Sequence, residues 1–184
     1  MAAKRGLQGQ RLLLCVCGGI AAYKAAELVR RLREAGAEVQ VAMTDNARRF
    51  VGAATLQALS GRAVRTSLWD EAAEAAMGHI ELARWADRVL VAPATANTLA
   101  KLAHGLADDL VSTLCLATVA PIAVAPAMNN RMWLHPATQA NLAILRQRGV
   151  RVIGPDEGPQ ACGEFGPGRM SEPAAIVAAL VEAA

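Results

Sequence analysis

The stretch RLLLCVCGGIAAYKAAELVRRLREAG, residues 11–36, decides the fold. It opens with a short, mostly apolar run over residues 11–17, and the pair Gly18-Gly19 follows. Further on, apolar residues recur at the spacing of an amphipathic helix up to Gly36, where such a helix is expected to end. The order strand, tight turn and helix opens a βαβ unit, so the sequence predicts an α/β protein.

The rest of the chain repeats this alternation. Apolar runs predict strands at residues 38–43, 88–92, 121–125 and 150–153, with a weaker one at 63–66. Helical stretches lie between them, and the tail 173–184 is expected to form a further helix or to lead into another domain. We therefore predict a doubly wound, Rossmann-like, three-layer α/β/α fold with a mostly parallel sheet of about six strands.

Length and composition favour a single domain over residues 1–184, with a flexible N-terminus at about 1–9 and a Gly- and Pro-rich flap at about 154–171. Hydrophobic residues make up 54% of the chain, enough for a buried core. The net charge of +3 is dispersed, which argues against a nucleic-acid partner. No apolar run is long enough for a membrane span, and residues 1–10 lack a signal-peptide core, so we expect a cytoplasmic protein.

The four cysteines form no CxxC pair, and no histidine stands at ligand spacing from them. Neither a metal site nor a disulfide framework is therefore expected.

Ligands of doubly wound sheets bind beyond the carboxyl ends of the strands, which selects four loops. In the first, Gly18-Gly19-Ile20 places small residues at a helix N-terminus, as in an anion site or in a tight βα turn without a ligand. The second strand ends in Met43-Thr44 rather than in an acidic ribose ligand, and the first loop does not fit GxGxxG. Both observations argue against NAD.

The other two loops carry more polar chemistry. PATANT, residues 93–98, offers two hydroxyls, an amide and backbone N–H groups to a phosphate or an isoalloxazine edge, although helix capping alone explains such residues. Its place beside Gly18-Gly19 favours a mononucleotide. PAMNNRMW, residues 126–133, puts two methionines and a tryptophan beside two amides, unlike the usual short polar turn.

Taken together, GGIAAYK (18–24), GHIEL (78–82), APATANT (92–98) and PAMNNRMW (126–133) resemble the homo-oligomeric flavin-containing cysteine decarboxylases. Within that family, ACGEFGPGRM (161–170) resembles the substrate clamp of phosphopantothenoylcysteine decarboxylases. The whole chain is similar to the amino-terminal half of the bacterial bifunctional enzyme, whose second half is a phosphopantothenate–cysteine ligase. A fused or separate ligase is therefore an expected partner.

The resemblance implies conversion of 4'-phosphopantothenoylcysteine to 4'-phosphopantetheine and CO₂ on the route to coenzyme A. Loss of a hydride from the CH₂–SH carbon to FMN gives a thioaldehyde that accepts the electrons of decarboxylation, and the hydride then returns. The resemblance assigns His79 as acid/base group, Asn129 as the residue that orients the carboxylate, and Cys162 as proton donor.

The resemblance also implies the binding residues and the assembly. The expected FMN contacts are Gly18, Gly19, Ile20, Thr44, Thr95, Ala96, Asn97, Thr98 and Ala127. The expected substrate contacts are Asn129, Met132, Arg84, Ala161 and Cys162. Relatives bind flavin between the subunits of a trimer, so a homotrimer, or a dodecamer of four trimers, is expected.

Two alternatives stay open. A peptidyl-cysteine decarboxylase would use the same chemistry on a larger substrate, but the loop that carries Cys162 argues against it. A non-catalytic flavin-binding regulatory module would be expected to lack His79 or Cys162, and both are present.

Overall fold

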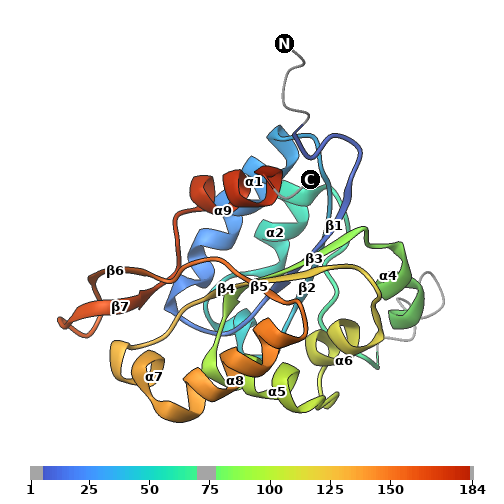
Figure 1. Ribbon diagram of the computed structural model, residues 1–184. Helices are drawn as coiled ribbons and strands as arrows, with labels where there is room; N and C mark the ends of the chain where they lie inside the picture. Colours follow the sequence, from blue (N-terminus) through green and yellow to red (C-terminus); the bar gives the residue numbers. More distant parts are fainter. Residues whose placement is uncertain (1–5, 70–77, 183–184) are drawn as a thin grey trace.

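The computed structural model describes residues 6–69 and 78–182, and within them five parallel strands form a central sheet (Figure 1). Their order in space is β2-β1-β3-β4-β5, and every neighbouring pair is parallel. The strands are β1 (Arg11–Val16), β2 (Glu38–Met43), β3 (Arg88–Ala94), β4 (Ile122–Pro126) and β5 (Arg151–Val152). The predicted doubly wound α/β fold is confirmed.

Helices cover both faces of the sheet and complete the three layers (Figure 1). One face carries α1 (Lys24–Glu34), α2 (Ala53–Ser60) and α9 (Pro173–Glu182). The other carries α4 (His79–Trp85), α5 (Ala96–His104), α6 (Leu110–Ala117) and α8 (Pro136–Gln147). Short helices in the loops of the described residues are η1 (Ile20–Tyr23), η2 (Ala47–Arg49) and α7 (Asn130–Leu134).

Helix α9 accounts for the described part of the tail that was expected to be helical. None of the helices in residues 6–69 and 78–182 combines the length and the apolar character that a membrane crossing requires.

The sheet has five strands where about six were expected, because the segment at 63–66 forms only one bridge. Arg65 lies beside Ala42 in parallel orientation, donates its N–H to Val41 O at 2.9 Å and accepts from Met43 N–H at 2.8 Å. The segment follows Gly61, which ends α2 with a φ of 72°. After Arg65 the chain leaves the edge of the sheet. Two hydrogen bonds at the edge do not amount to a strand.

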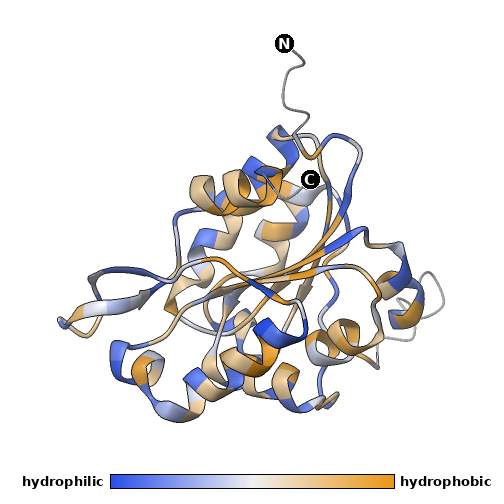
Figure 2. Ribbon diagram, in the orientation of Figure 1, coloured by the Kyte–Doolittle hydropathy of each residue, from blue (hydrophilic) through white to orange (hydrophobic). Residues whose placement is uncertain are grey.

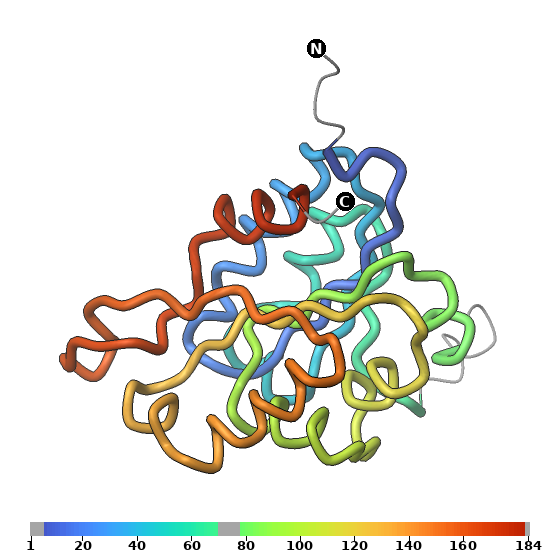
Figure 3. Tube along the Cα trace, in the orientation of Figure 1, coloured from blue at the N-terminus to red at the C-terminus, as the bar shows by residue number. Residues whose placement is uncertain are grey.

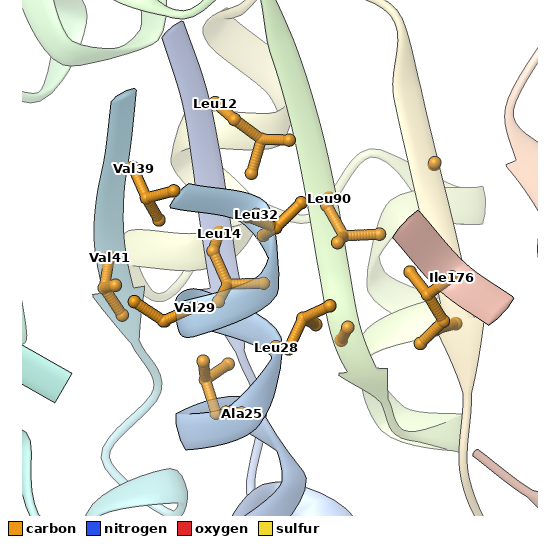
Figure 4. Packing of buried hydrophobic residues seen from close by; sticks show 14 of the residues in the cluster. Leu12, Leu14, Ala25, Leu28, Val29, Leu32, Val39, Val41, Leu90 and Ile176 are labelled. Atoms are coloured by element: carbon orange, nitrogen blue, oxygen red, sulfur yellow. The ribbon is translucent and has the colours of Figure 1, made fainter. Parts of the chain in front are cut away.

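The core lies on both faces of the strands, as the alternation of side chains along a strand requires. Leu12 and Leu14 of β1 lie in one cluster with Leu28 and Leu32 of α1 (Figure 4). Leu13 belongs to the cluster on the opposite face. Hydrophobic colouring runs along the strands, and hydrophilic residues concentrate in loops and on outer helix surfaces (Figure 2). Burial on both faces explains why the strands are continuous apolar runs.

The predicted flap folds as an antiparallel hairpin of β6 (Asp156–Pro159) and β7 (Phe165–Arg169), with residues 160–164 as its tip. We call this unit the flap hairpin; it projects from the sheet beside α7 (Figure 1, Figure 3). Gly168, with φ of 131°, accepts from Met128 N–H at 2.9 Å, and a Cβ at this position would collide with Met128 O. These two strands were not predicted, because their Gly and Pro content is typical of loops.

The N-terminus predicted to be flexible, about residues 1–9, lies partly outside the described residues. Its described part is attached to the domain: Leu7 is fully buried, and Gly9 N–H donates to Gly36 O at 2.9 Å. The chain is therefore already packed against the domain at Leu7, several residues before β1 begins.

The packing of α1 against the sheet can be tested by the stability of variants. Leu28→Ala should lower the free energy of unfolding by about 2–5 kcal/mol, because Leu28 is fully buried and its truncation leaves a cavity. Gln57→Ala on the exposed side of α2 is the control and should stay within about 0.5 kcal/mol of the parent. Urea unfolding at one protein concentration measures both; equal stability of the two variants would contradict the packing described.

Candidate active site

The order of the strands creates a crevice at one edge of the sheet. The connection after β1 leads through α1 to β2 on one side, and β3 lies on the other side, followed by α5 on the opposite face. Loops that leave β1 and β3 toward opposite faces diverge, and ligands of open α/β sheets bind at this switch point. A cavity of about 1010 Å³ lies here, lined by the loops after β1, β2, β3 and β4 and by the flap hairpin.

All nine residues expected to contact FMN line this cavity: Gly18, Gly19, Ile20, Thr44, Thr95, Ala96, Asn97, Thr98 and Ala127. Gly18 is required by packing, since a Cβ there would lie 2.6 Å from the backbone carbon of Asn46, in the loop after β2. At Gly19 a Cβ would meet only Thr95 Cγ2, at 3.8 Å. The two glycines therefore differ: the first lets two loops pack closely, and the second leaves room in the cavity.

The threonines after β3 tie two of the loops together. Thr95 is the N-cap of α5, and its Oγ1 accepts from Thr98 N–H at 3.2 Å. Thr98 Oγ1 donates to Cys17 Sγ at 3.2 Å across the β1–β3 boundary. Burial raises the pKa of the Cys17 thiol to about 12, so it stays neutral. Thr95 therefore caps α5, as the capping explanation of this loop expects. The positive N-terminal end of α5 also lies at the cavity.

Asn129 and Cys162, 33 residues apart in the sequence, meet at the cavity. The Asn129 Oδ1 accepts from Arg131 N–H at 2.9 Å and thereby caps α7. Its Nδ2 faces the tip of the flap hairpin, 3.2 Å from Gln160 Oε1, 3.4 Å from Cys162 Sγ and 3.0 Å from Glu164 Oε2. Cys162 is exposed, whereas the other three cysteines are buried.

Of the remaining predicted residues, Met132 and Ala161 line the cavity, but His79 and Arg84 do not. His79 is the first residue of α4, and Arg84 lies exposed on the same helix. Helix α4 packs against α6 on the same face as α5, but the chain's own fold brings neither side chain to the wall of the cavity.

Two lysines that the sequence analysis missed also line the cavity. Lys24 is only 8% exposed, and its Nζ donates to Met170 O at 3.1 Å and pairs with Glu172 at 2.8 Å. It thereby fastens the end of the flap hairpin to α1. A charged residue within the apolar stripe of α1 was the signal that could have revealed it.

Lys101 lies 2.8 Å from Asp108 Oδ1 and 2.7 Å from Asp109 Oδ2. Partial burial by itself would lower the pKa of Lys101, but hydrogen bonds to the two carboxylates outweigh it and raise the pKa. This lysine therefore remains a paired cation, which links α5 to the N-cap of α6.

Comparison with known proteins agrees with this geometry. The family model described as Flavoprotein matches residues 1–184. The chain belongs to this flavoprotein family. The coenzyme A biosynthesis bifunctional protein CoaBC of Escherichia coli (strain K12) is 60% identical over 171 residues, which are 93% of this chain and 42% of that protein. This flavoprotein thus spans less than half the length of the curated relative it matches.

Two solved structures match almost throughout. A cysteine-to-serine mutant of PPC decarboxylase complexed with pantothenoylaminoethenethiol has a TM-score of 0.83 and 34% identity, over 94% of this chain and 97% of that one. The FMN-dependent cysteine decarboxylase SpaF has a TM-score of 0.80 and 35% identity, over 97% of this chain and 99% of that one.

The two glycines after β1 provide a matched pair of variants. Gly18→Ala should lower the thermal unfolding midpoint by several degrees, because its Cβ would overlap the Asn46 backbone and force two loops apart. Gly19→Ala should leave the midpoint nearly unchanged, since its Cβ meets nothing closer than 3.8 Å. Calorimetry of both proteins without added ligand separates packing from binding; similar midpoints would contradict this assignment.

Proposed function

We propose that this chain catalyses the FMN-dependent decarboxylation of 4'-phosphopantothenoylcysteine to 4'-phosphopantetheine and CO₂, a step of coenzyme A biosynthesis. The observation that carries the proposal is the contact between the Asn129 amide and the Cys162 thiol at the cavity. A carboxylate-binding donor and a proton donor are groups that this reaction needs beside its cofactor. The similarity to PPC decarboxylase over nearly the whole chain supports the choice of substrate.

The residues present fit FMN. The cavity of about 1010 Å³ has the size of a pocket for a cofactor with a small substrate, and α5 begins at its wall. Helix N-terminal N–H groups and small residues suit a flat, anionic mononucleotide, and Gly18, Gly19, Thr44, Thr95 and Ala127 would hold it. When bound, FMN supplies reversible hydride chemistry at the CH₂–SH carbon of the substrate.

Asn129 would orient the substrate through its amide. Its Oδ1 is committed to the cap of α7, so only the Nδ2 end faces the flap hairpin, and this end donates hydrogen bonds. A carboxylate accepts such bonds, and holding it in one orientation aligns the bond that breaks. The same amide offers nothing to the product, which has lost the carboxylate.

Cys162 would act after CO₂ has left. Its thiol is exposed at the tip of the flap hairpin, 3.4 Å from the Asn129 amide. A thiol in this place can donate a proton to the enethiolate carbon, next to the carbon that regains its hydride. The other three thiols are buried in the core cluster on one face of the sheet.

His79 and Arg84 would act on the cavity of a neighbouring subunit. Neither lines the cavity of its own chain, yet His79 stands at the start of α4 beside exposed apolar residues. Ile80, Leu116 and Val119 are 42%, 59% and 99% exposed, and α4 packs against α6. An apolar surface next to these residues suits a subunit interface, so we propose a homotrimer, or four trimers in a dodecamer.

The proposed setting follows from the relatives. Because the E. coli relative is a bifunctional protein, we propose a phosphopantothenate–cysteine ligase, fused or separate, as a partner, and the cytoplasm as the location. Assays with phosphopantothenoylcysteine and with a C-terminal-cysteine peptide distinguish this function from a peptidyl-cysteine decarboxylase and from a non-catalytic flavoprotein.

Cys162→Ser tests the reaction itself. The variant should release CO₂ from phosphopantothenoylcysteine but stall before the final reduction, because a serine hydroxyl is a far weaker acid than a thiol. Mass spectrometry under anaerobic conditions should find a product two hydrogens lighter than phosphopantetheine. Cys115→Ser, at a buried thiol on α6, is the control and should give ordinary phosphopantetheine. Undiminished formation of phosphopantetheine by Cys162→Ser would show that the thiol has no chemical role.

Mixed oligomers test the origin of His79. His79→Asn and Asn129→Ala should each lose roughly 10²–10⁴-fold in turnover when expressed alone. Co-expressed in equal amounts, they should regain about a quarter of the parent activity, because random assembly then pairs an intact Asn129 with a neighbour's intact His79. Absence of any recovery, with mixed oligomers shown by mass spectrometry, would place His79 and Asn129 in the same chain's site.

A further inference from the structure

The tip of the flap hairpin presents three acceptors to one amide group. The Asn129 Nδ2 has two hydrogens, whereas Gln160 Oε1, Cys162 Sγ and Glu164 Oε2 all lie within 3.4 Å of it. The amide cannot turn over to relieve this excess, because its Oδ1 caps α7. The three acceptors therefore compete, and any incoming acceptor must displace one of them.

Glu164 is the strongest of these competitors. Its Oε2 is the nearest acceptor at 3.0 Å, and a carboxylate forms stronger hydrogen bonds than an amide oxygen or a sulfur atom. Its other oxygen, Oε1, lies 3.6 Å from the Arg131 Nε, in the first turn of the helix that Asn129 caps. The Glu164 carboxylate is thus held between an amide and a guanidinium, the pair of groups that would receive a carboxylate ligand.

We propose that Glu164 is an internal placeholder: its carboxylate occupies the Asn129 amide until the substrate carboxylate replaces it, and returns after CO₂ has left. This inference rests on the proposed function, since it assigns Asn129 to the substrate carboxylate. No covalent step is involved, because one carboxylate exchanges with another on the same donor. Glu164 is partly exposed at the tip of a hairpin, so its side chain can turn outward toward solvent and Arg131 without unpacking the core.

The placeholder affects the binding of substrate and of product differently. Substrate carries a carboxylate and competes with Glu164, whereas product has none and leaves the amide to Glu164. Because a carboxylate ligand must displace Glu164, its apparent dissociation constant equals the intrinsic constant divided by the fraction of time that the amide is free. Return of Glu164 restores the hydrogen bond once CO₂ has left, so that the amide is not left unsatisfied while product departs.

The test uses two ligands that differ only in the carboxylate. Phosphopantothenoylserine resembles the substrate but has no thiol to oxidise, and phosphopantothenoylethanolamine is its decarboxylated counterpart. Dissociation constants for the FMN-loaded oligomer are measured by calorimetry. Glu164→Gln should bind the serine ligand roughly tenfold tighter than the parent if Glu164 occupies the amide about nine-tenths of the time, and the ethanolamine ligand equally well.

Two further variants isolate the amide from general charge effects. Glu157→Gln removes a carboxylate from an exposed position on β6 of the same hairpin and should change neither dissociation constant by more than about twofold. In the Asn129→Ala background, Glu164→Gln should no longer strengthen binding of the serine ligand, because the contested donor is gone.

The outcomes separate the inference from the proposed function. If Glu164 only stiffened the hairpin, Glu164→Gln would weaken both ligands, and that result, or an unchanged ratio of the two constants, overturns the placeholder. If either result is found while the parent protein turns over phosphopantothenoylcysteine, only the placeholder is overturned and the proposed function stands. Parent protein that neither turns it over nor binds either ligand overturns the proposed function, and the inference with it.

Discussion

Strand β1 is the constraint on which the rest of the structure depends, because it is hydrogen-bonded on both sides. Its residues pair in register with β2 on one side and with β3 on the other, and its side chains alternate between the two core clusters. A slip by one residue would exchange the β1 side chains that pack in the two clusters. Fixing β1 therefore fixes where the loops after β1, β2 and β3 begin, and with them the walls of the cavity.

A second constraint joins the cavity to the flap hairpin. Polar contacts hold the hairpin at both ends. Lys24 binds Met170 O and Glu172 at its base, and Asn129 binds its tip. Between them, Met128 N–H donates to Gly168 O. The contact of Lys24 with Met170 O at the base is buried, whereas the contact of Asn129 with Cys162 at the tip is exposed, so the tip opens at lower cost than the base. This gradient allows the groups on Asn129 to exchange while the hairpin stays attached.

Much of this architecture could be predicted because it is local in the sequence. Apolar runs gave the positions of the five strands, and the rule about carboxyl ends gave the loops that line the cavity. The segment at 63–66 was overestimated, because a short apolar run does not reveal how many of its residues reach the sheet edge. The hairpin strands were missed because their Gly and Pro content is typical of loops, and because their contacts with Met128 and α7 are distant in the sequence.

The roles of single polar residues were less accessible, since they depend on distances that the sequence does not contain. Glu164 stands two residues after Cys162, and nothing in that spacing says that its carboxylate bends back to Asn129. The contact arises because Asn129 must cap α7, which directs its Nδ2 toward the hairpin, where three acceptors converge. A charge-assisted hydrogen bond contributes about 1.5–3 kcal/mol, less where water reaches it. An interaction of that size can hold the tip in place and still yield to a ligand with the same carboxylate group, so stability and exchange at this site come from one donor.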